Sequence, residues 1–379
     1  MLQIRPEVLA QEALARTVRR QLHQIPEPAF HEFETQKYLL TQLREMKPDK
    51  LELLAGTGIK AVFYACESMQ TVAIRADMDA LPIREDHQSD YISQNEGLMH
   101  ACGHDAHMTM ALLTAKYVSE NRNLLKQNVV FLFQPGEEGA GGAKRMIACG
   151  ALENPHVDYI YGMHVFPGMM PGQLGVCPGV FLARSYGFDI QIKGKASHAA
   201  HPDLGVDAIS AAAELIVMMQ QTMTHMVDPM EQATLHVGSI HGGERRNVVC
   251  DCVTLCCTLR TFSDDVYERI TAQLQHLFSA VYEATGAVCT MKVVQDYPMV
   301  VNSETLTLDY LTRNGDGTVP IGKQVIGEDF AYYLQEIPGL FVLLGIGDTP
   351  PLHSSNFHLD EKWLLYGVES NLRILFTEA

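Results

Sequence analysis

The stretch MTMALLTAKYVSENRNLLKQNVVFLFQPGEE, residues 108–138, contains the two patterns that decide the fold. Its first part, 108–120, has apolar residues at helical spacing, and its later part, 128–134, is a continuous apolar run typical of a buried strand. Similar short apolar runs, bounded by turn residues, occur at 59–65, 71–77 and 159–165. Strands that alternate with a helix in this way predict an α/β sheet.

The rest of the chain indicates two domains. Residues 6–46 have helical spacing, interrupted at Pro26 and Pro28. After about residue 180 the pattern becomes strand, helix, strand, strand, helix, strand, and a last apolar run follows at 340–347. We therefore predict an α/β sheet domain formed by 1–180 and 297–379, interrupted by an inserted ferredoxin-like α+β domain at 181–296.

Composition excludes several classes of protein. The chain has 379 residues, of which 47% are hydrophobic and 19% charged, so it is too apolar to be disordered. Its formal net charge of -17, without a dense Lys/Arg cluster, argues against a nucleic-acid partner. No secretory signal or membrane-spanning apolar run is present, and the nine cysteines are scattered. We expect a cytoplasmic protein with no membrane contact and mostly reduced thiols.

The segment HACGHDAH, residues 100–107, is the strongest local signal of chemistry. It contains imidazole, thiolate and carboxylate side chains, all of which bind first-row metals. Gly103 allows a tight turn that aims Cys102 and His104 at one point, whereas His107 falls on the next turn and is expected beside the ligands rather than among them.

Three further segments place ligand-type residues at strand ends. FQPGEEG at 133–139 has two adjacent carboxylates that point in different directions, so one can bind metal while the other acts as a base. GMH at 162–164 and LHSSNFH at 352–358 end other apolar runs. Alone, each fits a solvated acidic turn or a core histidine. Together they supply enough ligands for two divalent ions, namely Cys102, His104, Glu138, His164 and His353.

HACGHDAH, FQPGEEG, GMH, KASHAAHP, GEDF and LHSSNFH, in this order, resemble the dinuclear metallo-amidohydrolases. That family includes aminoacylases, hippurate hydrolases, auxin-conjugate hydrolases and N-acetyldiaminopimelate deacetylases, and this chain is most similar to the last. The resemblance covers nearly the whole chain. It implies hydrolysis of the amide bond of N-acyl amino acids, as in lysine biosynthesis, with two divalent ions of Mn, Zn, Co or Ni.

The resemblance also implies roles for individual residues. Cys102 bridges the two ions, Glu137 is the catalytic acid/base and His198 stabilises the oxyanion. Asn247 and Arg260 hold the substrate, and the inserted domain acts as a lid and pairs two chains as a homodimer. Asp77 and Asp79, in RADMDALP, are expected to orient the ligand imidazoles.

Several alternatives stay open from sequence. The chain could be a dipeptidase or a hippurate or auxin-conjugate type of hydrolase, because the segments that favour the deacetylases are shared more widely. A metal-dependent binding protein without catalysis is a further alternative, although it predicts loss of Glu137 or of a ligand, and all are present. A zinc peptidase of another fold would require an HExxH motif, which the sequence lacks.

Overall fold

The computed structural model describes residues 2–67, 70–86 and 88–376. The chain divides into two compact units, each described here by itself. Unit 1 consists of Met1–Phe181, Val301–Gly322 and Asp329–Ala379, and unit 2 consists of Leu182–Val300 and Lys323–Glu328. The sequence pattern does not indicate that 323–328 separates from its neighbours. Residues 323–328 belong to unit 2 because Gln324 forms a β-bridge with Leu182. The Gln324 carbonyl also accepts the Ala183 N–H at 3.1 Å.

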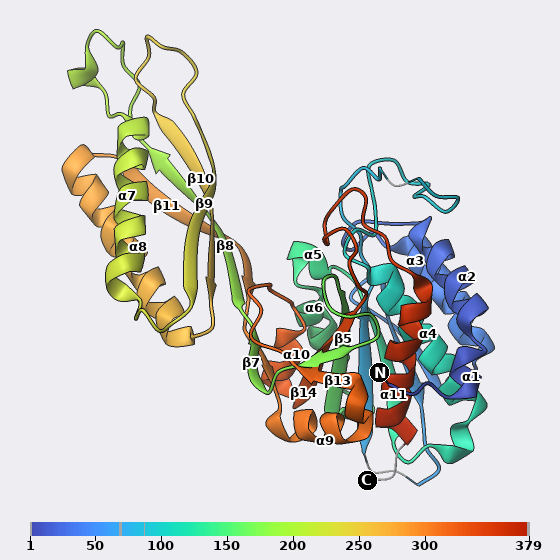
Figure 1. The fold of residues 1–379 in the computed structure, drawn as a ribbon. Helices are drawn as coiled ribbons and strands as arrows, with labels where there is room; N and C mark the ends of the chain where they lie inside the picture. Colours follow the sequence, from blue (N-terminus) through green and yellow to red (C-terminus); the bar gives the residue numbers. More distant parts are fainter. Residues whose placement is uncertain (1, 68–69, 87, 377–379) are drawn as a thin grey trace. The chain divides into compact units, whose positions relative to one another are not determined.

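Unit 1 is built on an eight-stranded mixed sheet (Figure 1). In spatial order its strands are β1 (Lys50–Leu54), β2 (Gly58–Phe63), β4 (Asn128–Gln134), β3 (Thr71–Asp77), β5 (Tyr159–Phe166), β14 (Gly339–Gly345), β6 (Leu174–Val176) and β13 (Thr318–Pro320). The four central strands β4, β3, β5 and β14 are parallel. Their carboxyl ends therefore meet at one edge, where open α/β sheets bind ligands.

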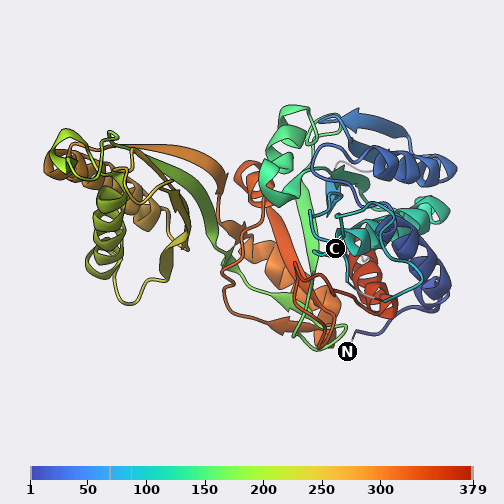
Figure 2. The ribbon, with the colours of Figure 1, turned by 90° about the horizontal axis from the view of Figure 1, so that it is seen from above.

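Helices cover the sheet of unit 1, as Figure 2 shows from above. They are α1 (Pro6–Leu9), α2 (Glu12–His23), α3 (Phe33–Glu45), α4 (His104–Glu120), α5 (Glu137–Ala140), α6 (Gly142–Ala148), α9 (Glu304–Asn314), α10 (Ala331–Glu336) and α11 (Leu364–Phe376). Short 3-10 turns occur at Arg122–Leu124, Gly315–Gly317 and Glu361–Trp363. Every residue of β3 and β14 is buried, which explains why these strands have continuous apolar runs.

Helix α4 begins at His104, four residues before the apolar pattern predicts. Its first turn contains polar residues, and these are nevertheless buried, which hides them from a hydrophobic pattern. Cys102 and His104 therefore lie at the N-terminus of a core helix rather than in a free loop.

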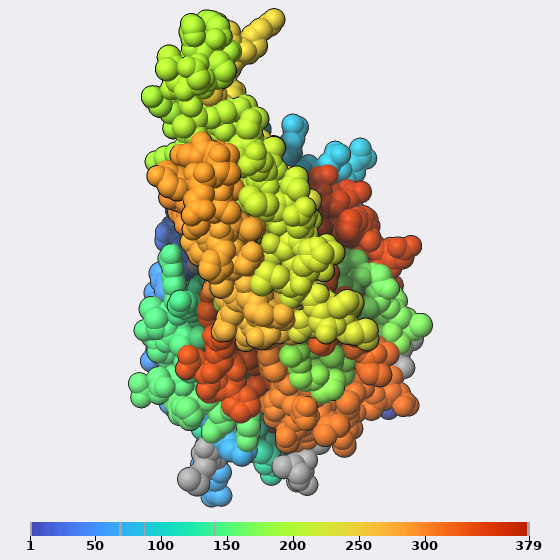
Figure 3. Space-filling model, turned by 90° about the vertical axis from the view of Figure 1, so that its left-hand side faces the viewer, coloured from blue at the N-terminus to red at the C-terminus, as the bar shows by residue number. Residues whose placement is uncertain are grey.

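Unit 2 has a four-stranded antiparallel sheet in the order β11 (Val288–Tyr297), β8 (Arg184–Lys193), β10 (Cys252–Thr261) and β9 (Ala233–Gly242). Residues of β10 alternate between buried and more exposed positions, because α7 (Ala208–Met226) and α8 (Asp264–Thr285) cover one face. Figure 3 shows the side chains of these two helices from outside. A 3-10 turn at Pro202–Leu204 also belongs to this unit, and β7 (Gly179–Leu182) pairs with β12 (Val300–Asn302) in a separate small sheet.

The described helices include none with the length and apolar character needed to cross a membrane.

Candidate metal centre

The five candidate ligands converge at the carboxyl edge of the central strands. Cys102 precedes α4, and Gly103 joins it to His104 with a φ of +86°. A Cβ atom at Gly103 would lie 2.5 Å from Val165 Cγ2, so only glycine fits this turn against β5. Consequently the thiol and the first imidazole of α4 face the end of β5, where His164 stands.

Cys102 occupies the middle of the cluster. Its Sγ lies 3.3 Å from His164 Nε2 and 3.3 Å from His353 Nε2. Ligand atoms of Cys102, His104 and His164 all lie within 4.8 Å of one another, and so do those of Cys102, Glu138 and His353. The Cys102 thiol therefore belongs to both groups of candidate ligands.

Unpartnered polar atoms indicate that the site is built for cations. His104 Nδ1 donates to the carbonyl of Asp79 at 2.8 Å, so Nε2 is the nitrogen that can face a metal ion. That Nε2 is buried without a hydrogen-bond partner and lies 4.0 Å from Glu138 Oε1, which in turn lies 3.2 Å from His353 Nε2. His164 Nδ1 likewise donates to the Val165 carbonyl at 2.7 Å, so its Nε2 faces the thiol. The Nε2 atoms of these two imidazoles and the Cys102 thiol are therefore placed to bind divalent ions.

The charges of the site lead to the same conclusion. Burial, together with Glu138, Glu137 and Asp77, raises the pKa of the Cys102 thiol well above its usual range. A thiolate here therefore needs a positive charge beside it, which bound metal supplies. Burial alone would lower the pKa of His104, but the carboxylates of Asp77, Asp79 and Glu138 outweigh it and raise that pKa to about 10.

His353 and His107 have different parts in the arrangement. His353 has a φ of +63°, an unfavourable value for a residue with a side chain, and its N–H donates to the Ala101 carbonyl at 2.8 Å. This bond ties its loop to the Cys102 turn. His107 Nδ1 donates to Asp77 at 2.6 Å and its Nε2 accepts the Val165 N–H at 2.9 Å. Because both nitrogens are used, His107 supports β5 and does not coordinate metal in this geometry.

Glu137 and Glu138 diverge from a turn held by buried carboxylates. Gly136 has a φ of +66°, and Glu138 and Gly139 depart from helical geometry inside α5. Asp79 accepts the N–H groups of Glu137 at 3.0 Å and of Glu138 at 2.9 Å. A carboxylate oxygen of Glu137 lies within 4.8 Å of ligand atoms of His104 and Glu138. The Glu138 carboxylate thus lies among the candidate ligands. The Glu137 carboxylate lies beside them, at a position suited to a general base.

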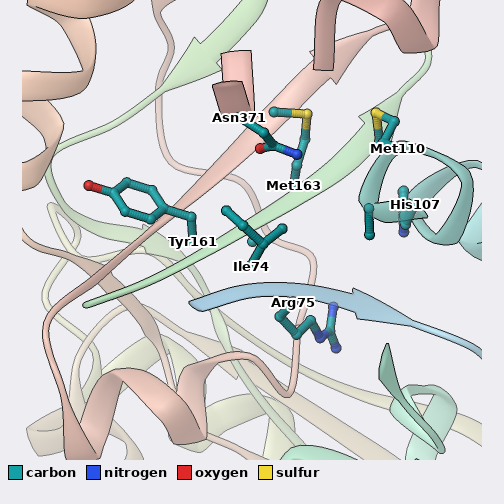
Figure 4. A pocket seen from close by; sticks show the side chains of 9 residues that line it. Ile74, Arg75, His107, Met110, Tyr161, Met163 and Asn371 are labelled. Atoms are coloured by element: carbon teal, nitrogen blue, oxygen red, sulfur yellow. The ribbon is translucent and has the colours of Figure 1, made fainter. Parts of the chain in front are cut away.

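A buried network behind the ligands was not found from sequence. Arg75 donates to Gln134 at 2.9 Å, to Asp77 at 2.6 Å and to Asp329 at 2.8 Å. Figure 4 shows Arg75 and His107 beside a cavity of about 10 Å³, mostly lined by apolar side chains. Two features of the sequence could have indicated this network. They are the arginine inside the apolar run of β3 and the motif GEDF, which contains Asp329.

The other predicted residues lie in unit 2. His198 forms a bridge with Val248, and the Asn247 carbonyl accepts the Ala199 N–H at 3.0 Å, so His198 and Asn247 belong to neighbouring loops. Arg260 pairs with Ser185 near the far end of β10, whereas the first residue of that strand, Cys252, pairs with Lys193. His198 and Asn247 lie beyond the Cys252 end of β10, and Arg260 lies near its other end. At about 3.3 Å per residue, most of the length of β10 therefore separates Arg260 from His198 and Asn247.

The cysteines at 250, 252, 256 and 257 do not form a further metal group among the described residues. Cys257 packs inward at 7% exposure, while Cys252 is exposed.

Comparison with known proteins gives one consistent family. The model described as peptidase family M20/M25/M40 matches residues 73–377. N-acetyldiaminopimelate deacetylase of Listeria monocytogenes is 34% identical over 363 residues, covering 94% of this chain and 97% of the relative. A dinuclear metal binding peptidase of the M20 family from Bacillus subtilis is 31% identical, with a TM-score of 0.82 over 97% of both chains. A structure from methicillin resistant Staphylococcus aureus is 33% identical, with a TM-score of 0.90 over 97% of both.

Proposed function

Because this chain belongs to peptidase family M20/M25/M40, we propose that the site around Cys102 hydrolyses N-acetylated amino acids, with N-acetyldiaminopimelate as the first substrate to test. The chain is a metal-dependent hydrolase of amide bonds. The observation that carries the proposed hydrolysis is the turn at Gly136, which leaves Glu138 beside the other candidate ligands and Glu137 next to them for proton transfer.

The residues have distinct proposed parts in this reaction. Cys102, His104, Glu138, His164 and His353 would hold two divalent ions, which polarise the amide carbonyl and acidify water when bound. Glu137 takes the proton of the attacking water and returns that proton to the amide nitrogen as the carbon–nitrogen bond breaks. Water is consumed, and acetate and a free amino acid are released.

We further propose that unit 2 is the inserted lid and that it pairs two chains. Its strand, helix, strand, strand, helix, strand order supports a separate ferredoxin-like domain. Within one copy, His198 and Asn247 lie at the opposite end of β10 from Arg260. Oxyanion and carboxylate contacts to one small substrate could then come from two copies, with His198 acting across a homodimer. Light scattering that finds a fully active monomer of 42.1 kDa would contradict this pairing.

The decisive experiment is a panel of N-acetyl, N-benzoyl and N-succinyl amino acids, including N-acetyldiaminopimelate, assayed with added manganese, zinc, cobalt or nickel. The proposal predicts the highest kcat/KM for an N-acetyl substrate. A preference for benzoyl amino acids would indicate a hippurate type of hydrolase, and cleavage of dipeptides alone would indicate a dipeptidase.

Glu137→Gln is the matched test of the base. The amide keeps the size of the carboxylate but cannot take the proton, so turnover should fall by several orders of magnitude while metal content stays constant. Activity equal to the unsubstituted enzyme would refute the assigned role.

A further inference from the structure

The turn that precedes Glu137 is held from outside the metal centre by the segment PAFHE, residues 28–32, between α2 and α3. Glu32 has no exposed surface. Its Oε1 accepts the N–H of Gly136 at 3.0 Å and the N–H of Phe30 at 2.9 Å. Its Oε2 accepts the Thr57 hydroxyl. The carboxylate thus joins two backbone segments that are 104 residues apart in sequence.

Phe30 contacts the same turn through its ring. A Cβ atom at Gly136 would lie 2.8 Å from Phe30 Cε2 and Cζ, so the ring occupies the place of a side chain there. Phe30 itself has a φ of +60°, and the guanidinium carbon of Arg145 lies 3.8 Å from its ring centroid. An unfavourable backbone conformation that persists needs compensating contacts, and these are the Arg145 stacking and the bond from the Phe30 N–H to Glu32.

Three successive N–H groups in this turn are bound by two buried carboxylates. Glu32 binds the N–H of Gly136, and Asp79 binds those of Glu137 and Glu138. Asp79 also accepts a hydrogen bond from the candidate ligand His104 through its carbonyl, whereas the hydrogen bonds of the Glu32 carboxylate go to Gly136, Phe30 and Thr57. Replacing Glu32 therefore removes a support of the turn without removing any contact to a candidate metal ligand.

We propose that Glu32, aided by the Phe30 ring, is a positioning residue that fixes the left-handed turn at Gly136 and thereby the direction of Glu137. This inference rests on the proposed role of Glu137 as the base. Loss of the support should misplace the base and lower kcat, because small displacements of a reacting group cost large factors in rate. KM and metal content should change little, since neither Glu32 nor Phe30 is a ligand.

The test compares Glu32→Ala, Glu32→Gln and a control, Glu27→Ala. Glu27 immediately precedes this segment and also accepts backbone N–H groups, from Glu34 at 3.1 Å and Thr35 at 2.9 Å, but these belong to α3. With metal content measured in each, Glu32→Ala should lose at least tenfold in kcat with KM within twofold, and Glu27→Ala should keep its kcat. Glu32→Gln should recover most of the kcat, because its amide oxygen still accepts the Gly136 N–H and its NH₂ group can donate to the Thr57 hydroxyl.

Amide hydrogen exchange supplies a readout that does not depend on activity. Glu32→Ala should raise exchange at 136–138 in the metal-free protein, and Glu27→Ala should leave it unchanged. If Glu137→Gln is fully active, the proposed base fails while the exchange result still decides whether Glu32 holds the turn. Equal kcat in Glu32→Ala and Glu27→Ala, or a Glu32→Gln variant as impaired as Glu32→Ala, would overturn the positioning role.

A double variant tests Phe30 separately. Gly136→Ala should lower kcat more than tenfold, because its methyl group meets the Phe30 ring at a φ that disfavours alanine. Adding Phe30→Ala should restore at least threefold, since the ring no longer blocks the methyl group. A double variant no more active than Gly136→Ala would remove Phe30 from the proposal.

Discussion

Replacing Arg75 by methionine should destabilise unit 1 more than the same replacement of the buried cation Lys60. Arg75 is 3% exposed, and it donates to the fully buried carboxylates of Asp77 and Asp329 as well as to Gln134. Methionine has a similar volume but no charge, so it would leave two buried carboxylates without their cation. Breaking a buried pair from one side costs about 3–5 kcal/mol, a large part of the roughly 5–15 kcal/mol that stabilises a domain.

Lys60→Met is the matched control for this prediction. Lys60 is also fully buried, but its Nζ donates to the carbonyls of Gly150, at 3.4 Å, and Glu153. Removing it leaves neutral acceptors, which costs about 1–3 kcal/mol. Arg75→Lys should fall between the unsubstituted protein and Arg75→Met, because one ammonium keeps the charge but cannot reach all three acceptors.

The assay is urea unfolding of metal-free protein followed by tryptophan fluorescence. The single tryptophan, Trp363, lies in unit 1 and therefore reports this unit. Metal must be removed from every variant, since ligand binding to the native state would add to the measured stability. If Arg75→Met costs no more free energy than Lys60→Met, the guanidinium is not the counter-charge of the two carboxylates.

Three further changes test separate features. Cys102→Ala should lower metal content and rate together, and two ions retained at full affinity would rule out the bridge. Burial raises the pKa of Cys257 to about 12, so above pH 9 the unfolded chain loses a proton that the native state keeps, and stability should fall by up to ~1.4 kcal/mol per pH unit. Urea unfolding followed by circular dichroism at pH 8–11 should show a smaller fall for Cys257→Ala, and identical slopes would contradict the assignment. Burial lowers the pKa of Arg260, which forms no ion pair within the described residues. Arg260→Ala should weaken kcat/KM for N-acyl amino acids by about 2–4 kcal/mol; an equal loss on the neutral carboxamides would show that it supports the fold instead.

The sequence by itself determined the parts of the fold that depend on periodic burial. The apolar run 71–77 coincides with β3, because a strand that is buried on both faces appears as a continuous apolar run in the sequence. The residue types at strand ends also indicated the cluster around Cys102, since the carboxyl ends of parallel strands converge.

Only the tertiary structure decided which polar groups meet. Arg75 and Asp329 are 254 residues apart, and Glu32 and Gly136 are 104 apart, so no local pattern connects either pair. The first turn of α4 was missed for a related reason, because His104 and Asp105 look solvent-exposed in a hydrophobic pattern yet are buried with partners from other segments. A buried polar group is stable only when distant segments bring its partner, and that pairing exists only after the chain has folded.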